Sequence, residues 1–273
     1  MQSFPTNPIS AIRSHWQHRD LIVQLTKREI LGRYRGSALG SIWSVINPLL
    51  LLAIYTFVFS SVFKSRWPGM HSESKFDFAL ILFAGLIPFN FFCELLARSP
   101  NLIIANSNYV KRIVFPLEIL PSVALLAAAF HAIINLAALL IFQFAVHRSL
   151  HPTLFYSIPI MLSLSLATLG VAWLLSAIGA YFRDLGQIIG MATTILMFLS
   201  PIFYPTQALP EAFQRVVHLN PLTWVIEAMR SAILWGAPPS IEGSLIYLFF
   251  SLIIATTGYW LFQKARTGFS DVL

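Results

Sequence analysis

The segment KREILGRYRGSALGSIWSVINPLLLLAIYTF, residues 27–57, joins a basic stretch to an unbroken apolar run. The apolar part extends from Ser41 to Phe63, about the 20 residues that a helix needs to cross roughly 30 Å of hydrocarbon. Lysine and arginine immediately before a span hold that end on the cytoplasmic side. The segment therefore predicts a membrane-spanning helix with a basic anchor at its start.

The composition of the whole chain points to the same class. Of its 273 residues, 57% are hydrophobic and only 11% are charged, whereas soluble domains carry about 25% charged residues. The net charge of +7 would suit a nucleic-acid binder, but the basic residues lie in short segments between apolar runs. That pattern is typical of anchoring at anionic lipid headgroups. We expect membrane lipids, and no nucleic acid, as partners.

The apolar runs predict an all-α integral membrane protein with six transmembrane helices in one domain, residues 1–273. Residues 1–40 form a cytoplasmic amphipathic lead, 41–262 the spans, and 263–273 a cytoplasmic tail. No cleavable signal peptide is expected, because the first apolar run follows a long polar lead. The predicted spans are 41–63, 78–96, 117–146, 154–181, 188–204 and 244–262.

Lysine and arginine are distributed unevenly between the two sides. With both termini on one side, that side receives twice as many of them as the other. The richer side holds Arg13, Arg19, Lys27, Arg28, Arg33, Arg35, Arg98, Lys111, Arg112, Arg183, Lys264 and Arg266. The positive-inside rule therefore predicts cytoplasmic termini.

Residues 205–240, between the fifth and sixth spans, are too polar to cross and too apolar for a plain loop. The apolar residues recur at helical spacing, and Glu227 and Arg230 lie off that face at a spacing that lets them pair. We expect two short helices, broken at Asn220-Pro221, that dip into the outer leaflet. A helix lying on the outer surface is the open alternative.

Enzymatic motifs are absent from the sequence. It has no G-x-x-x-x-G-K-[ST] phosphate loop, no H-E-x-x-H and no G-x-S-x-G. We expect no catalytic residues, no metal and no cofactor on this chain. If ATP is used, another polypeptide binds it.

His131 and Asn135 lie one helical turn apart in the third span. They are the only pair of this kind that we expect in the middle of the membrane. A proton relay would need a carboxylate partner. Glu94, Glu118 and Asp184 are expected near the cytoplasmic ends, which favours simple hydrogen bonding between helices. Glu94 and Arg98 are spaced to form an i, i+4 pair where the second span meets the cytoplasm.

The lead RDLIVQLTKREILGRYRG, residues 19–36, is basic and amphipathic, which suits a helix in the headgroup plane. The residues expected to anchor it at the interface are Arg33, Tyr34, Arg35 and Trp43. Gly32, Gly36 and Gly40 are spaced by four. They provide either a flat strip for close helix contact or flexibility at a bend, and both interpretations are open.

Aromatic residues make up 14% of the chain. Tyr55 and Phe59 fall on one face of the first span, and Phe198, Phe203 and Tyr204 crowd the end of the fifth. Aromatic faces suit the C–H surfaces of sugar rings, and tyrosine hydroxyls bond sugar hydroxyl groups. Phenylalanine is also ordinary lipid-facing material, so composition leaves the choice open.

Four motifs in order carry a family resemblance: LTKREILGRYRGSALGSIWSVINPLLLLAIYTFVFSSVF at 25–63, NSNYVKRIVFPLEILP at 106–121, SAIGAYFRDLGQII at 176–189, and LSPIFYP with NPLTWVIEAMR at 199–205 and 220–230. Each is loose alone. Together they cover nearly the whole chain, which resembles the membrane subunits of ABC-2 type polysaccharide exporters, the family that moves O-antigen, capsule and teichoic-acid chains.

The resemblance implies a half-transporter in the bacterial inner membrane. Two copies would enclose a channel for a lipid-linked polysaccharide, and two copies of a separate ATPase, which bind ATP and Mg, would dock from the cytoplasm. The ATPase interface would include Asn106, Asn108, Tyr109, Lys111, Arg112, Arg183 and Asp184. For Arg183 and Asp184, a local ion pair that caps helices is the alternative.

The resemblance also assigns an outer gate and channel-lining aromatics. The gate would include Pro210, Leu222, Trp224, Met229 and Trp235, and the channel Tyr55, Phe59, Phe198 and Tyr204. Two other functions stay open: an ABC-2 permease for a drug or lipid, and a proton-coupled carrier that uses His131.

Overall fold

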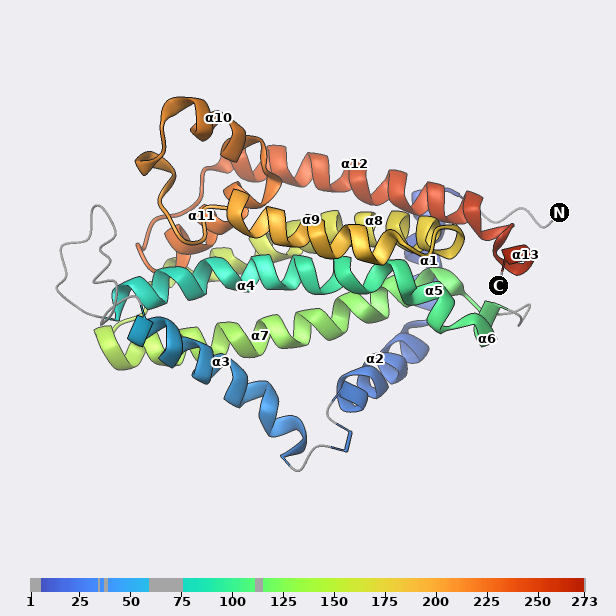
Figure 1. The fold of residues 1–273 in the computed structure, drawn as a ribbon, viewed down its shortest axis with the longest axis horizontal. Helices are drawn as coiled ribbons and strands as arrows, with labels where there is room; N and C mark the ends of the chain where they lie inside the picture. Colours follow the sequence, from blue (N-terminus) through green and yellow to red (C-terminus); the bar gives the residue numbers. More distant parts are fainter. Residues whose placement is uncertain (1–5, 34, 37–38, 59–75, 111–114, 273) are drawn as a thin grey trace.

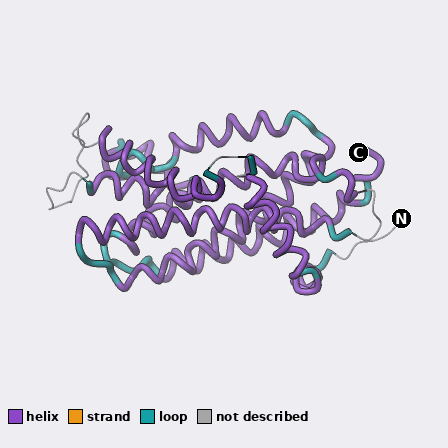
Figure 2. The backbone as a smooth tube through the Cα atoms, turned by 90° about the horizontal axis from the view of Figure 1, so that it is seen from below, coloured by secondary structure: helices purple, strands orange, loops and turns teal. Residues whose placement is uncertain are grey.

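The computed structural model describes residues 6–33, 35–36, 39–58, 76–110 and 115–272. Within these ranges every regular element is a helix, as Figure 2 shows. The predicted all-α class is therefore confirmed. The short helices and 3-10 turns of the connections are η1 (Gly40–Ile42), η3 (Ser99–Asn101), α5 (Leu102–Ala105), α6 (Ser107–Val110), η4 (Leu117–Ile119), η5 (Pro152–Tyr156) and η6 (Thr206–Ala208).

Four long helices form the body of the bundle and lie side by side (Figure 1). Each belongs to a segment that is long and apolar enough to cross a membrane. These helices are α4 (Asp77–Arg98), α7 (Leu120–His147), α8 (Ser157–Tyr181) and α12 (Ile241–Arg266). They match the second, third, fourth and sixth predicted spans, with α12 longer than expected at both ends.

Two further apolar helices correspond to the first and fifth predicted spans. The first is α3 (Trp43–Tyr55), whose helical run continues to Val58, beyond which the expected span lies outside the described residues. The second is α9 (Leu185–Leu199), which was expected to reach Tyr204. It ends early because Ser200 is extended, as is favoured before proline, here Pro201.

The first and last helices lie at the same end of the bundle (Figure 1). We call this the terminal end; it carries α1 (Pro8–Gln17) and α13 (Phe269–Val272). The arrangement agrees with an even number of crossings. The expected polar tail forms a helical turn instead, because Phe269 is fully buried against Phe262 and Tyr181.

The lead helix α2 (Arg19–Arg33) packs on the bundle. Its Ile22 and Leu25 are buried against Ile119 and Val123 at the start of α7. After α2 the chain turns: Gly36 has φ of 86° and Gly40 has φ of 52°, a region that favours glycine. Gly36 and Gly40 therefore lie in a bend, while Gly32 is still part of α2, so the three glycines do not form a continuous strip on one helix within this chain.

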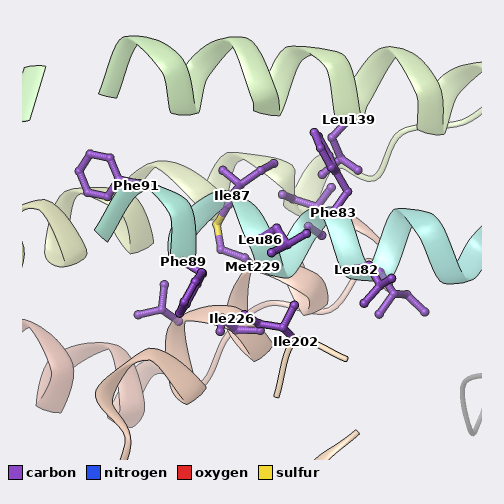
Figure 3. Close-up of a cluster of buried hydrophobic side chains, with 14 of the residues drawn as sticks. Leu82, Phe83, Leu86, Ile87, Phe89, Phe91, Leu139, Ile202, Ile226 and Met229 are labelled. Carbon is purple, nitrogen blue, oxygen red and sulfur yellow. The ribbon is translucent and has the colours of Figure 1, made fainter. Parts of the chain in front are cut away.

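The opposite end carries α10 (Glu211–Leu219) and α11 (Pro221–Ile233) (Figure 1). They separate at Asn220, whose side chain accepts a hydrogen bond from the amide of Leu222 at 3.0 Å, and Pro221 fits the first turn. The predicted break is confirmed. Figure 3 shows Ile226 and Met229 of α11 packed with Leu86 and Phe89 of α4.

Two glycines bring α8 and α12 into direct backbone contact. A Cβ added at Gly170 would lie closer than 3.0 Å to the backbone of Ile254, and one at Gly258 would meet the backbone of Gly170. Small residues allow such close approach between helices in lipid. This contact fixes α12 against the rest of the bundle.

Candidate functional site

A cavity of about 850 Å³ opens between α2, α3, α4 and α7. Its walls combine apolar side chains with polar and charged ones. The polar and charged residues of the lining are Glu29, Arg33, Ser44, Asn47, Asn90, Glu94, Arg98, His131, Asn135 and Thr193. Polar lining between apolar helices marks this cavity as the candidate functional site.

Five ionisable side chains meet in this cavity, and we call them the ionic cluster: Glu29, Arg33, Glu94, Arg98 and His131. Glu94 lies at the centre. Its carboxylate accepts a hydrogen bond from Nη1 of Arg33 and lies 3.1 Å from Nδ1 of His131. Arg98 pairs with Glu29 of the lead helix. The cluster therefore connects α2 to both α4 and α7.

The centre of the cluster is buried within the bundle. The side chains of His131 and Glu94 are only 12% and 19% exposed. His131 lies about 16 Å along α7 from Leu120, at 1.5 Å per residue, so it is well inside the apolar segment. Ionisable groups at such positions are costly, and they usually carry function.

The structure overturns one prediction about His131. The sequence predicted no carboxylate partner for His131, but Glu94 supplies one from a position 37 residues away in the chain. Glu94 sits one turn before the end of α4, and the path of α7 beside it brings the two side chains together. The predicted Glu94–Arg98 pair is confirmed at 3.9 Å, although Arg98 makes its closer contact with Glu29.

The expected interface anchors take different positions. Arg33 was expected among lipid headgroups, but its guanidinium reaches Glu94 inside the cavity. Trp43 is half-buried at the first residue of α3, and Arg35 is exposed. Tyr34 lies outside the described residues.

Among the predicted channel aromatics, the described ones, Tyr55, Phe198 and Tyr204, do not line this cavity. Tyr55 packs against the main hydrophobic core, and Phe198 is 64% exposed on α9. Tyr204 donates a hydrogen bond from its hydroxyl to the carbonyl of Phe198 at 2.8 Å. Phe59 lies outside the described residues. Their role in a channel stays a prediction.

The predicted gate residues separate into two groups. Leu222 and Met229 are fully buried in the core of the bundle. Pro210 precedes α10 and is exposed, while Trp224 is half-buried and Trp235 is exposed. Trp224 lies on α11, and Trp235 follows the end of this helix.

Arg230 was expected on the polar side of its helix, and the structure corrects this. Its side chain is 1% exposed. The guanidinium donates to the carbonyls of Ile81, Pro201 and Ile202 at 3.0, 2.6 and 2.8 Å. Glu227 accepts a hydrogen bond from Thr206. Arg230 thus ties α11 to the start of α4 and to the segment after α9.

The predicted ATPase-interface residues lie in two connections. Asn106 caps α5, Asn108 is exposed, and Tyr109 stacks on Phe115 with ring centroids 4.3 Å apart. Tyr109 also accepts a hydrogen bond from Arg28 of α2 at 3.2 Å. Arg183 and Asp184 are both exposed in the turn between α8 and α9. Lys111 and Arg112 lie outside the described residues.

Glu118 forms a buried set of contacts at the terminal end that the sequence did not predict. Its carboxylate accepts hydrogen bonds from Ser14 of α1 at 2.7 Å and from Arg266 of α12 at 2.6 Å. Trp173 of α8 donates to its backbone carbonyl at 2.9 Å. One residue therefore joins both chain ends to the start of α7. No local pattern in the sequence marks it, because its partners are distant along the chain.

A bundle of apolar helices that encloses a charged cavity defines an integral membrane protein with a polar interior. Residues 20–234 match the ABC-2 type transporter family. The chain belongs to this family.

Several characterised proteins are similar to this chain over nearly their whole length. An O-antigen export system permease protein RfbA of Klebsiella pneumoniae is 28% identical over 93% of this chain and 95% of its own. The RfbA protein of Myxococcus xanthus is 25% identical over 96% and 99%. The polysialic acid transport protein KpsM of Escherichia coli is 28% identical over 92% and 96%.

Proposed function

We propose that this chain is the membrane permease of an ATP-driven exporter that moves a polysaccharide across the bacterial inner membrane. The proposal depends on one observation. This chain is similar to O-antigen and polysialic acid transport proteins along almost the full length of this chain and of those relatives. Those relatives favour a polysaccharide over the drug or lipid cargo of other ABC-2 permeases. A lipid-linked chain end is the expected form of the cargo.

In the proposed topology all six apolar helices cross the membrane. The terminal end faces the cytoplasm, as the distribution of basic residues supports, and α10 and α11 re-enter from the outer side. The two short helices, α3 and α9, would cross at the edge of the bundle. The 15 residues of α9 extend about 22 Å at 1.5 Å per residue, so its crossing needs the flanking segments as well.

Two copies of the chain would form the conduit. No residue of α9 is buried in the single chain, so this helix is free to meet a second copy. Thr193 of α9 lines the same cavity as residues of α3 and α4. A homodimer that joins at this side would extend the cavity into a continuous path, with Tyr55, Phe59, Phe198 and Tyr204 near its outer part.

Energy would come from two copies of a separate ATPase that bind ATP and Mg at the terminal end. The ATPase would dock on the connections at 106–112 and 183–184. Tyr109 contacts Arg28 of α2, and α2 carries Glu29 and Arg33 into the ionic cluster. A push on the first connection would therefore move α2 relative to α4 and change the width of the cavity.

Export by cells tests this function. A strain that lacks the chromosomal copy should lose its surface polysaccharide, and the permease together with its ATPase should restore it. Reversing two charges, Lys111→Glu with Arg112→Glu, should abolish export while the protein is still inserted at normal level. Normal export by this variant would contradict the assigned docking segment, and export without any ATPase would contradict the proposed function.

The Glu94–His131 pair also supports a second candidate, a proton-coupled carrier, because it supplies the carboxylate that a relay needs. The two functions differ in their energy source. A carrier would work in vesicles with a proton gradient and no nucleotide, and it would stop when His131→Ala is made. The exporter requires ATP hydrolysis in the same vesicles.

A further inference from the structure

A second pocket, of about 320 Å³, lies at the end of the bundle opposite the termini. It lies along α11 and is also lined by the segments before α10 and before α12. We call it the outer pocket. Its lining residues are Pro205, Thr206, Gln207, Trp224, Glu227, Ala228, Arg230, Ser231, Trp235, Pro238, Pro239 and Ser240.

Two tryptophans supply aromatic surface to this pocket. Trp224 is held in place by Tyr247 of α12, with nearly parallel rings and centroids 5.0 Å apart. Gly243 leaves the room for this ring, since a Cβ there would strike the indole nitrogen. Trp235 is 44% exposed at the edge. One ring is therefore fixed and the other is accessible to a ligand.

Polar groups surround these rings. Thr206 donates a hydrogen bond to Oε1 of Glu227 at 2.8 Å, which orients the carboxylate. A carboxylate has two oxygens, so Glu227 can still accept from a ligand hydroxyl group. Gln207 and Ser240 add an amide and a hydroxyl group to the lining.

The charge of the pocket decides between ligand classes. Arg230 lies at its base, but all three guanidinium nitrogens donate to backbone carbonyls inside the bundle. Hydrogen bonds to neutral carbonyls leave the charge of Arg230 in place, so the opposite charges of Arg230 and Glu227 sum to zero over the lining. A pocket without net charge gives an anionic lipid headgroup no electrostatic attraction, while the carboxylate of Glu227 still accepts hydrogen bonds from hydroxyl groups.

We propose that the outer pocket binds one or two sugar residues of the exported chain as it leaves the membrane. Its volume is near the lower end of the range for small-ligand sites, about 300 to 1,000 Å³. The apolar face of a sugar ring packs on Trp235, and the ring hydroxyl groups bond Glu227 and Gln207. This subsite rests on the proposed function and adds a contact outside the conduit.

Fragment binding to the intact transporter in nanodiscs tests the subsite. The probe is a set of two- to four-residue oligosaccharides released by mild acid from the surface polysaccharide of the bacterium that carries this gene. Saturation-transfer NMR and tryptophan fluorescence report binding. Trp235→Ala and Glu227→Gln should each weaken binding about tenfold, and Trp235→Phe, which keeps an aromatic face, by about threefold or less.

Trp260→Ala is the matched control. Trp260 is 42% exposed, close to the exposure of Trp235, and lies on α12 beneath Lys264, near the terminal end. Its removal should leave fragment binding unchanged. Size-exclusion profiles and ATPase activity establish that each variant is folded and assembled.

Three results would overturn the subsite: no fragment binding to the wild type, equal binding by wild type and Trp235→Ala, or loss of membrane insertion alone in Trp235→Ala, which would make Trp235 a lipid-interface anchor. In each case export by the wild type continues. A different result would contradict the proposed function itself: the wild-type transporter would then export no polysaccharide at all.

Discussion

Glu94 on α4 and His131 on α7 lie 3.1 Å apart inside the large cavity, and Arg33 of the lead helix donates to the same carboxylate. The contact connects a helix outside the main bundle with two helices inside it. The lead helix also contacts the first connection at the terminal end, where Arg28 donates to the hydroxyl of Tyr109.

Glu94→Ala should block export and lower stability. The change removes the carboxylate that both Arg33 and His131 contact. Losing this hydrogen-bond acceptor should lower the free energy of unfolding by about 1 to 3 kcal/mol. Thermal unfolding of the purified protein and the rate of export measure the two effects. Glu242→Ala, which removes an exposed carboxylate in the first turn of α12, should change neither. Full export by Glu94→Ala would show that the ionic cluster is not needed.

Arg230→Met should detach the outer helices from the bundle. Its three hydrogen bonds go to buried carbonyls, and the loss of their donor should destabilise the fold by at least about 2 kcal/mol. Gly85→Ala should act in the same direction but less, because its Cβ would lie 2.7 Å from Nη2 of Arg230. Limited proteolysis between α9 and α12 reports the detachment. Equal protease resistance in all three proteins would contradict this role.

Gly170→Ala and Gly258→Ala should each separate α8 from α12. Both added Cβ atoms would meet backbone closer than 3.0 Å, and overpacking of this kind costs about 1 to 3 kcal/mol. Thermal unfolding in detergent measures the loss.

Gly32→Ala provides the control for both glycine variants. Gly32 lies in α2, outside the proposed contact between two copies, with nothing within 4 Å of its added Cβ. Alanine is the better helix former there by about 0.5 to 1 kcal/mol, so stability should be unchanged or slightly higher. A loss like that of Gly170→Ala would show that helix approach is not the cause.

Glu118→Gln and Arg266→Gln should have effects that do not add. The two side chains are bonded at 2.6 Å and are only 8% and 10% exposed. Each single change should weaken the attachment of α12 to η4, and the double variant should lose little more, since the shared contact is already gone. A double-mutant cycle on unfolding free energy measures the coupling. Additive effects would show that the pair acts independently.

Many of the helices could be predicted from the sequence. The long apolar runs predicted α4, α7, α8 and α12, and Asn220-Pro221 predicted the break between α10 and α11. These features depend on neighbours along the chain: hydropathy over a window, a cap and a proline. The end of α9 was placed too late because Phe203 and Tyr204 continue the apolar run past Ser200-Pro201, and hydropathy outweighed the local break.

The side-chain contacts of the site could not be predicted from the sequence to the same extent. Arg33 was expected in the headgroups and Arg230 on a polar face, yet both side chains point into the bundle. No local sequence pattern predicted the contacts of Glu118. In each case the partners come from distant helices, so the contact depends on the rotation of each helix about its axis and on how closely the helices approach.

The sequence by itself determined the class of protein, the main helices and the break at Asn220-Pro221, because apolar length and proline act locally on the backbone. Only the tertiary structure decided that Glu94 meets His131 and Arg33, that Arg230 joins α11 to α4, and that Glu118 joins both chain ends. Ion pairs and hydrogen bonds require atoms within about 3 Å of each other. That separation is set by helix packing in three dimensions.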